Sequence, residues 1–220
     1  MGKLIVIEGL DGSGKATQTA LLARWLSGQG AVARQVSFPN YQSPSSSLIK
    51  MYLAGEFGTQ PGDVNAYAAS AFYAVDRFAS YKAEWEGFYS QGGIVLADRY
   101  ATSNFIYQAA KLPVEARQEF VEWQQNFEYG KLGIPKPDLV LYLDVPPGVS
   151  QALLEKRYKG DRTQRDIHEK NLAYLLECRA AALWCAGLLG WQVVPCCEKD
   201  EMRSVEEIAA ELTRIVRDVL

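Results

Sequence analysis

Short apolar runs alternate with amphipathic stretches along this chain. The apolar runs predict strands at 4–7, 31–38, 94–97, 139–144 and 192–195. Strands that are apolar on both faces are typical of a parallel sheet covered by helices on both sides. The pattern therefore predicts one α/β domain, residues 1–220, built on about five parallel strands.

Apolar residues spaced three or four apart predict helices between these strands. Asp63 is expected to cap a long helix that runs to about Trp85, and Ser204 with Glu207 forms a capping box before the last helix. A polar, basic segment at about 157–166 lacks periodicity and is expected to form a short mobile lid. The predicted helices cover 17–26, 48–54, 63–85, 103–110, 114–129, 149–156, 166–188 and 204–219.

A glycine-rich segment joins the first predicted strand to the first predicted helix. It reads Gly9-x-x-x-x-Gly14-Lys15, in the strand–turn–helix context that a phosphate-binding P-loop requires. Backbone N–H groups and the helix N-terminus attract an anion, and the lysine adds a point charge. The alternative is a glycine-rich turn with a surface lysine. The expected nucleotide-binding residues are Gly9, Asp11, Gly12, Ser13, Gly14, Lys15, Ala16 and Thr17.

Composition narrows the class of protein. A net charge of −3 provides no general basic field, so we expect no nucleic-acid partner. We also expect no membrane-spanning stretch, and the P-loop lies too near Met1 to leave room for a signal peptide. These features predict a cytoplasmic protein. The cysteines are expected to be reduced thiols without a metal, and His168 to be a surface or helix-start residue.

Other charged and aromatic residues fall near the predicted ends of strands and on one helix. Asp98 and Arg99 follow the third strand, where they could hold Mg²⁺ and clamp a phosphate, or form only a structural ion pair. Tyr73 and Arg77 lie four apart on one helix face and could receive a base and its phosphate, or serve packing. The basic segment carries Arg157, Lys159, Arg162 and Arg165, which could close over a phosphoryl group or simply be solvated.

Together these motifs resemble the thymidylate (dTMP) kinases of the nucleoside-monophosphate kinase group, with its P-loop kinase fold. The landmarks occur in family order across nearly the whole chain. They are G-L-D-G-S-G-K-A-T-Q at the P-loop, Phe38-Pro39, F-Y-A-V-D-R at 72–77, D-R-Y at 98–100, Tyr107-Gln108, P-K-P-D-L-V-L-Y-L-D at 135–144 and D-I-H-E at 166–169.

The resemblance implies transfer of the γ-phosphoryl group of ATP to dTMP, with Mg²⁺, in a homodimer. ATP would contact the P-loop and Arg157. Because position 12 is glycine, the catalytic arginine would come from the lid. The implied catalytic residues are Lys15, Asp98, Arg99, Arg162 and Arg165, with Asp98 also at the metal. The implied dTMP-binding residues are Asp11, Phe38, Pro39, Tyr73, Arg77, Arg99, Ser103, Tyr107 and Gln108.

Two positions depart from the family pattern. Ala16 replaces the Ser or Thr hydroxyl that usually binds Mg²⁺, and Asn40-Tyr41 stands where the family often has an arginine for the acceptor phosphate. The alternatives are therefore a kinase for another nucleoside monophosphate or nucleoside, or a non-catalytic nucleotide-binding protein.

Overall fold

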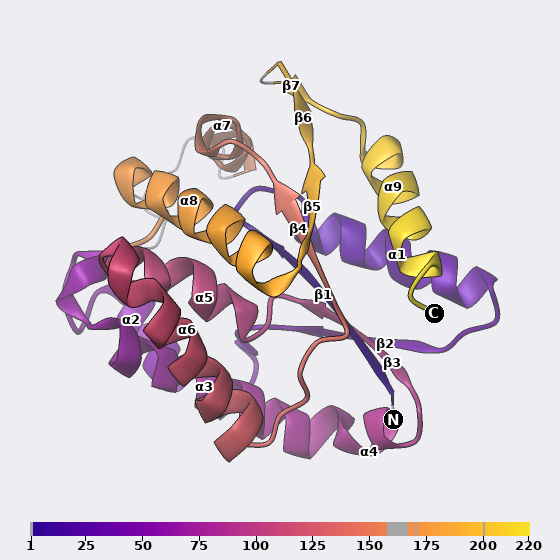
Figure 1. The fold of residues 1–220 in the computed structure, drawn as a ribbon, viewed down its shortest axis with the longest axis horizontal. Coiled ribbons are helices and arrows are strands. Elements are labelled where there is room, and N and C mark those ends of the chain that lie inside the picture. Colours follow the sequence, from indigo (N-terminus) through magenta and orange to yellow (C-terminus); the bar gives the residue numbers. More distant parts are fainter. Residues whose placement is uncertain (1, 158–166, 170, 200) are drawn as a thin grey trace.

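A twisted five-stranded sheet forms the centre of the computed structural model, which describes residues 2–157, 167–169, 171–199 and 201–220 (Figure 1). Its strands are all parallel and lie in the order β2-β3-β1-β4-β5. The predicted parallel α/β sheet is thus confirmed. The strand bounds are β1 (Lys3–Gly9), β2 (Ala33–Ser37), β3 (Ile94–Asp98), β4 (Leu139–Asp144) and β5 (Gln192–Pro195).

Helices cover both faces of the sheet. Successive β1 side chains point to opposite faces, so Leu4 and Val6 join one core cluster whereas Ile5 and Ile7 join another. Helices α5 and α8 pack on the first face, and α1 and α9 pack on the second (Figure 1). The helix bounds are α1 (Lys15–Gly28), α2 (Ser47–Ala54), α3 (Ala66–Ser80), α4 (Glu86–Ser90), α5 (Thr102–Tyr107), α6 (Arg117–Gln125), α7 (Pro147–Arg157), α8 (Leu172–Leu189) and α9 (Val205–Arg217).

The start of the long helix differs from the prediction. Asn65 caps α3, because its Oδ1 accepts a hydrogen bond from the Ala68 amide at 2.8 Å. Asp63 instead closes a short 3₁₀ turn by accepting from the Gln60 amide at 3.0 Å. Asp63 and Asn65 are both good capping residues, and they lie two positions apart. Because Asp63 is used in the 3₁₀ turn, the helix begins after Asn65.

Some predicted helices are broken into shorter pieces. Helix α3 continues through a π-helical turn, Tyr81–Trp85, into α4. In the same way, α6 continues into a π-helical segment, Asn126–Lys131. A 3₁₀ turn, Ala109–Lys111, follows α5. The small antiparallel hairpin of β6 (Cys197–Glu198) and β7 (Glu201–Met202) was not predicted.

Helix α8 differs from the expectation that no stretch of the chain is apolar enough to span a membrane. By length and composition alone, it is long and apolar enough to cross a membrane. In the fold, its buried side chains, including Cys178, Ala182 and Cys185, belong to the core cluster between α5 and the sheet. The four cysteines are free thiols, as expected, and three of them are buried.

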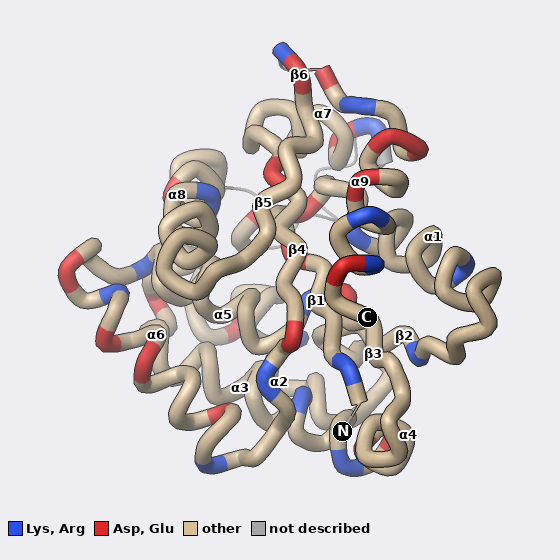
Figure 2. Tube along the Cα trace, turned by 45° about the vertical axis from the view of Figure 1, so that its right-hand side comes forward, with Lys and Arg blue, Asp and Glu red and all other residues tan. Residues whose placement is uncertain are grey.

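Acidic and basic residues are interspersed over the described part of the chain (Figure 2). Both signs occur along α9, where Glu206 and Glu207 lie in the first turn and Arg214 and Arg217 in the last. This arrangement matches the dipole of the helix, which favours negative charge at its start and positive charge at its end.

Candidate active site

The P-loop is formed where β1 ends and α1 begins. Gly12 and Gly14 have φ angles of 83° and 85°, which side chains rarely allow. A Cβ atom on Gly12 would also lie 2.6 Å from the carbonyl oxygen of Ser150, so glycine is required there on two counts. The backbone therefore turns as a phosphate-binding loop must, and α1 starts directly after it.

Lys15 is buried against this loop. Its Nζ donates a hydrogen bond to the Leu10 carbonyl at 2.8 Å. Burial lowers the pKa of Lys15 to about 8, although the nearby carboxylates of Asp11 and Asp98 oppose this shift. An anionic ligand would stabilise the charged ammonium group and raise this pKa again, so the site favours phosphate.

A cleft of about 690 Å³ opens beside the P-loop. It is wide enough for a nucleotide, because ligand pockets typically measure roughly 300–1,000 Å³. The cleft is lined by P-loop residues, by the segment that follows β2, by the residues at the end of β3 and by α7. Its lining residues include Asp11, Gly12, Gly14, Lys15, Ala16, Thr17, Phe38, Pro39, Asp98 and Arg99.

Arg99 lines this cleft and lies in a turn that directly follows β3. Its φ angle is 67°, a left-handed conformation that is uncommon outside glycine. Its Nη2 lies 2.6 Å from Asp11 Oδ1, and the Tyr107 hydroxyl donates to Asp11 Oδ2 at 3.0 Å. Burial alone would raise the pKa of Asp11, but the charges of Arg99 and Lys15 outweigh it and hold that pKa well below its usual range.

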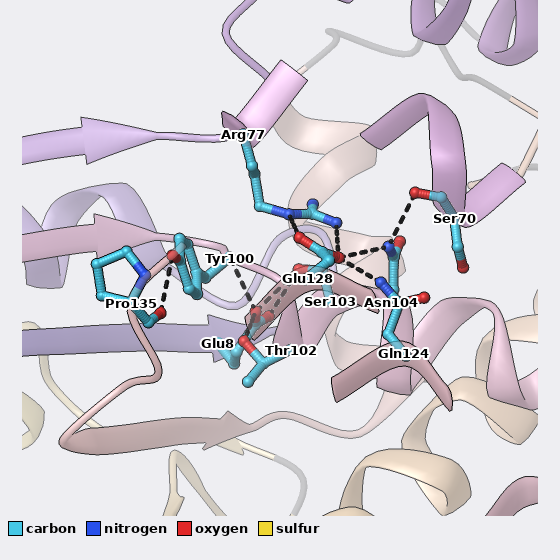
Figure 3. A network of polar contacts seen from close by, with 10 residues as sticks. All are labelled: Glu8, Ser70, Arg77, Tyr100, Thr102, Ser103, Asn104, Gln124, Glu128 and Pro135. Carbon is cyan, nitrogen blue, oxygen red and sulfur yellow. Dashed lines mark hydrogen bonds and ion pairs between the residues drawn. The ribbon is translucent and has the colours of Figure 1, made fainter. Parts of the chain in front are cut away.

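Glu8 holds this turn in place from beneath and was missed in the sequence. Its buried carboxylate accepts hydrogen bonds from the Tyr100 amide at 3.2 Å, from Thr102 Oγ1 at 2.6 Å and from Ser103 Oγ at 2.9 Å (Figure 3). Burial raises the pKa of Glu8 despite the opposing charge of Arg99. A glutamate inside an otherwise apolar strand is the signal that could have identified it.

A second pocket adjoins the cleft and contains all nine predicted dTMP-binding residues. They are Asp11, Phe38, Pro39, Tyr73, Arg77, Arg99, Ser103, Tyr107 and Gln108. Tyr41, Leu53, Tyr100, Asn104 and His168 complete its wall. Asp11 and Arg99 line both spaces, so the two sites meet at this ion pair. The roles assigned to these residues stay predictions.

Arg77 is less free than its position in the sequence suggested. Its side chain is 2% exposed and pairs with Glu128, Nε donating to Oε2 at 2.6 Å and Nη2 to Oε1 at 2.5 Å (Figure 3). Burial would lower the pKa of Arg77, but the carboxylate beside it raises the pKa overall. Its charge is thus balanced by a residue outside the pocket wall, whereas Arg99 pairs with Asp11 and both of these residues line the two sites.

The expectation for His168 was wrong, because its side chain is only 5% exposed. The Tyr52 hydroxyl lies 2.9 Å from its Nε2, and its ring stacks on Tyr107 with centroids 5.6 Å apart. Burial, helped by the nearby charge of Lys111, lowers the pKa of His168 to about 3. The residue is therefore a neutral part of the pocket wall, next to a tyrosine that contacts Asp11.

The predicted lid and metal residues lie in different parts of the chain. Arg162 and Arg165 lie outside the described residues, and Arg157 ends α7 with its side chain outside the description. Asp98 is partly exposed and lines the cleft with Lys15 and Thr17. In the described part of the chain, no group of three or more His, Cys, Asp or Glu could hold a metal by itself. A single carboxylate fits an ion that keeps several waters and binds phosphates, as Mg²⁺ does.

A parallel sheet, a P-loop and an adjoining arginine-containing pocket at the carboxyl ends of the strands define a P-loop kinase. A family model, Thymidylate kinase, matches residues 7–201. A probable thymidylate kinase of Pyrobaculum aerophilum is 30% identical over 98% of this chain and 97% of its own length. The thymidylate kinase of Mycobacterium tuberculosis is 35% identical over 74% of this chain and 73% of its own.

A solved structure of thymidylate kinase from Candida albicans has the same fold. Its TM-score is 0.69 at 21% identity, and the match covers 99% of this chain and 92% of that one. With the family model matching most of its length, the chain belongs to the thymidylate kinase family.

Proposed function

We propose that this protein transfers the γ-phosphoryl group of ATP to dTMP, giving ADP and dTDP. The observation that carries the proposal is the meeting of two sites at Asp11 and Arg99, one site built on the P-loop and the other on the second pocket. A phosphoryl donor in the cleft and an acceptor in the pocket would face each other across this ion pair. Membership of the family supports the choice of nucleotides.

Each group has a role in the transfer. The P-loop amides and Lys15 would bind the β- and γ-phosphates, with Arg157 on the ATP side, and Arg99 would hold the acceptor phosphate. An oxygen of that phosphate attacks the γ-phosphorus while the bond to the β-phosphate oxygen breaks, so ADP leaves. The protein acts by positioning the two nucleotides and neutralising charge.

The pocket residues would then orient the acceptor. Asp11 would meet the sugar hydroxyl, Tyr73 would stack on the base, and Ser103 and Gln108 would line the base. Phe38, Pro39 and Tyr107 would close the remaining walls, as their places in the pocket support.

Mg²⁺ is part of this proposal, with Asp98 as the residue that would hold it through water. When bound, the ion supplies positive charge to the phosphates. Asp98 lies in the cleft beside Lys15, which supports the assignment. We further propose that the enzyme works in the cytoplasm as a homodimer, with small-molecule nucleotides as its substrates.

The test is a coupled ADP-release assay with ATP, Mg²⁺ and a panel of dTMP, dUMP, dCMP, dGMP and thymidine. We expect saturable activity with a clear preference for dTMP. Because Tyr41 replaces a phosphate-binding arginine in the pocket wall, preference for another member of the panel is the outcome that would change the acceptor. ATP binding without turnover of any acceptor would contradict the proposal and favour a non-catalytic nucleotide-binding protein.

A further inference from the structure

Two polar side chains meet at one end of the second pocket, Arg77 from α3 and Asn104 from α5. Both are 2% exposed. Among the described residues, Arg77 Nη1 and Asn104 Oδ1 have no hydrogen-bond partner, although the other polar atoms of both side chains do. One donor and one acceptor are thus left for a ligand.

Glu128 fixes both of these side chains from outside the pocket wall. It lies in the π-helical segment after α6, with its side chain wholly buried. It accepts two hydrogen bonds from Arg77 and one from Asn104 Nδ2 at 3.4 Å, and Gln124 Nε2 also donates to it (Figure 3). All of these partners are donors, which is what an ionised carboxylate requires.

The orientation of the Asn104 amide follows from these contacts. Its Nδ2 donates to the Ser70 carbonyl and to Glu128 Oε1, at 3.4 Å each. A flipped amide would place Oδ1 against two acceptor oxygens and leave buried groups unpaired, which costs about 1–3 kcal/mol each in general. Because Arg77 can only donate, the pocket has a fixed pattern of one donor beside one acceptor.

That pattern fits only some pyrimidine bases. Thymine and uracil offer an N3–H donor next to a carbonyl acceptor, whereas cytosine offers an unprotonated N3 next to an amino group. Asn104 Oδ1 can accept from N3–H while Arg77 Nη1 donates to the carbonyl. With cytosine, Asn104 Oδ1 would face the unprotonated N3, acceptor against acceptor. Arg77 Nη1 would face the amino group, donor against donor.

We propose that Glu128 is the positioning residue for base selection, because it holds Arg77 and Asn104 in the one arrangement that matches a thymine or uracil edge. The inference rests on the proposed function, since it concerns the acceptor pocket of that reaction. It adds a residue that does not line the pocket and that the sequence did not single out.

The experiment measures equilibrium binding of dTMP, dUMP and dCMP by calorimetric titration to the wild-type protein and to Glu128→Gln. The NH₂ group of the glutamine must face donors in either orientation, so the fixed pattern is lost. At the Oε2 position it would oppose Arg77 Nε, and at the Oε1 position it would oppose Arg77 Nη2, Asn104 Nδ2 and Gln124 Nε2. We expect the preference for dUMP over dCMP to fall about tenfold or more. The control is Glu122→Gln, the same change at an exposed position of α6, which should leave that preference within about twofold.

The outcomes separate the inference from the proposed function. A wild-type protein that binds neither dTMP nor dUMP contradicts the proposed function itself. A wild type that prefers dUMP, together with a folded Glu128→Gln variant of unchanged preference, overturns the role of Glu128 alone.

Where Glu128→Gln does not fold, as judged by its melting curve, Glu128→Asp takes its place. Aspartate keeps an acceptor-only carboxylate but is one methylene too short to reach Arg77 and Asn104 together. We expect dUMP to remain preferred while the affinity falls about fivefold or more. Wild-type affinity in this variant would overturn the proposal.

Discussion

Ala16 is the residue at which this chain departs most from a phosphate-binding loop. It is exposed and lines the cleft together with Asp98 and Lys15. Without a hydroxyl there, Mg²⁺ would be held by phosphates, water and Asp98.

Replacing Ala16 with threonine supplies the missing ligand. We expect Ala16→Thr to lower the Mg²⁺ concentration that gives half-maximal activity, by about threefold or more, because the ion gains a direct oxygen ligand. A Mg²⁺ titration of the kinase activity measures this change. Ala16→Val adds similar bulk without the hydroxyl and serves as the control. If the threonine and valine variants titrate alike, position 16 does not face the ion.

The buried ammonium group of Lys15 lowers the free energy of unfolding at neutral pH. Its pKa is about 8 in the folded protein against an ordinary 10.5, so the unfolded chain binds this proton more tightly. The folded state is penalised in full below pH 8, and its stability rises with pH between about 8 and 10.5 as the penalty disappears.

Removing the buried ammonium group should relieve that penalty. We expect Lys15→Met to raise the free energy of unfolding at pH 7 by about 1–3 kcal/mol, to flatten its rise above pH 8 and to abolish turnover. Urea unfolding at several pH values measures the first two effects. Lys50→Met, at an exposed position of α2, should change neither. A less stable Lys15→Met protein at pH 7 would contradict the burial argument.

At the scale of single elements, the capping box of α9 contributes to the free energy of unfolding through hydrogen bonds within the first turn of the helix. Ser204 Oγ accepts from the Glu207 amide at 3.2 Å, and Glu207 Oε2 accepts from the Ser204 amide at 2.9 Å. The helix then buries Ile208, Leu212 and Val216 against the sheet.

Deleting the cap should loosen α9 without affecting catalysis. We expect Ser204→Ala to lower the free energy of unfolding by about 0.5–2 kcal/mol, because the first turn loses a hydrogen-bond acceptor. Denaturant unfolding measures the loss, and kcat should be unchanged. Ser204→Thr keeps the hydroxyl and should lose much less. Equal losses in the two variants would mean that side-chain fit, not capping, decides stability here.

The basic segment at 157–166 is an element-scale prediction made from the sequence alone. We expect Arg162→Ala or Arg165→Ala to lower kcat by about 10³-fold, far more than either change weakens ATP binding, because a lid arginine would neutralise charge that develops during transfer. Steady-state kinetics with separate ATP titrations measures both effects. Lys159→Ala in the same segment is the control. Full kcat in both arginine variants would make the lid assignment wrong.

At the scale of the whole molecule, α3 leaves apolar side chains exposed on one face. Tyr67, Val75 and Phe78 are 39%, 45% and 38% exposed, and their spacing places them on the same side of the helix. A second copy of the chain could cover this face.

The proposed homodimer can be tested there. We expect the wild-type protein to sediment as a dimer, and Phe78→Glu to shift it toward monomer, since a charge at a buried apolar contact is costly. Sedimentation velocity over a range of concentrations measures the shift. Val32→Glu changes another exposed apolar residue, in the α1–β2 loop, and should leave the dimer intact. A wild-type monomer at all concentrations would contradict the homodimer.

Local patterns in the sequence determined much of this protein. The apolar runs gave the bounds of β4 and β5. For β4, which is buried on both faces, the apolar signal needs no partner to be recognised. The P-loop and the Ser204 capping box were equally readable, since each is formed by residues a few positions apart. The nine residues predicted to bind dTMP also came from motifs, through resemblance to a family, and they line one pocket.

Only the tertiary structure decided which polar groups are buried together. Glu8 meets Thr102 across 94 positions and Arg77 meets Glu128 across 51, and no local spacing predicts such pairs. His168 was wrongly expected near the surface because its neighbours Tyr52 and Tyr107 come from distant elements. A buried charge or imidazole is stabilised only by partners that the fold brings to it, so its environment cannot be read from its own segment.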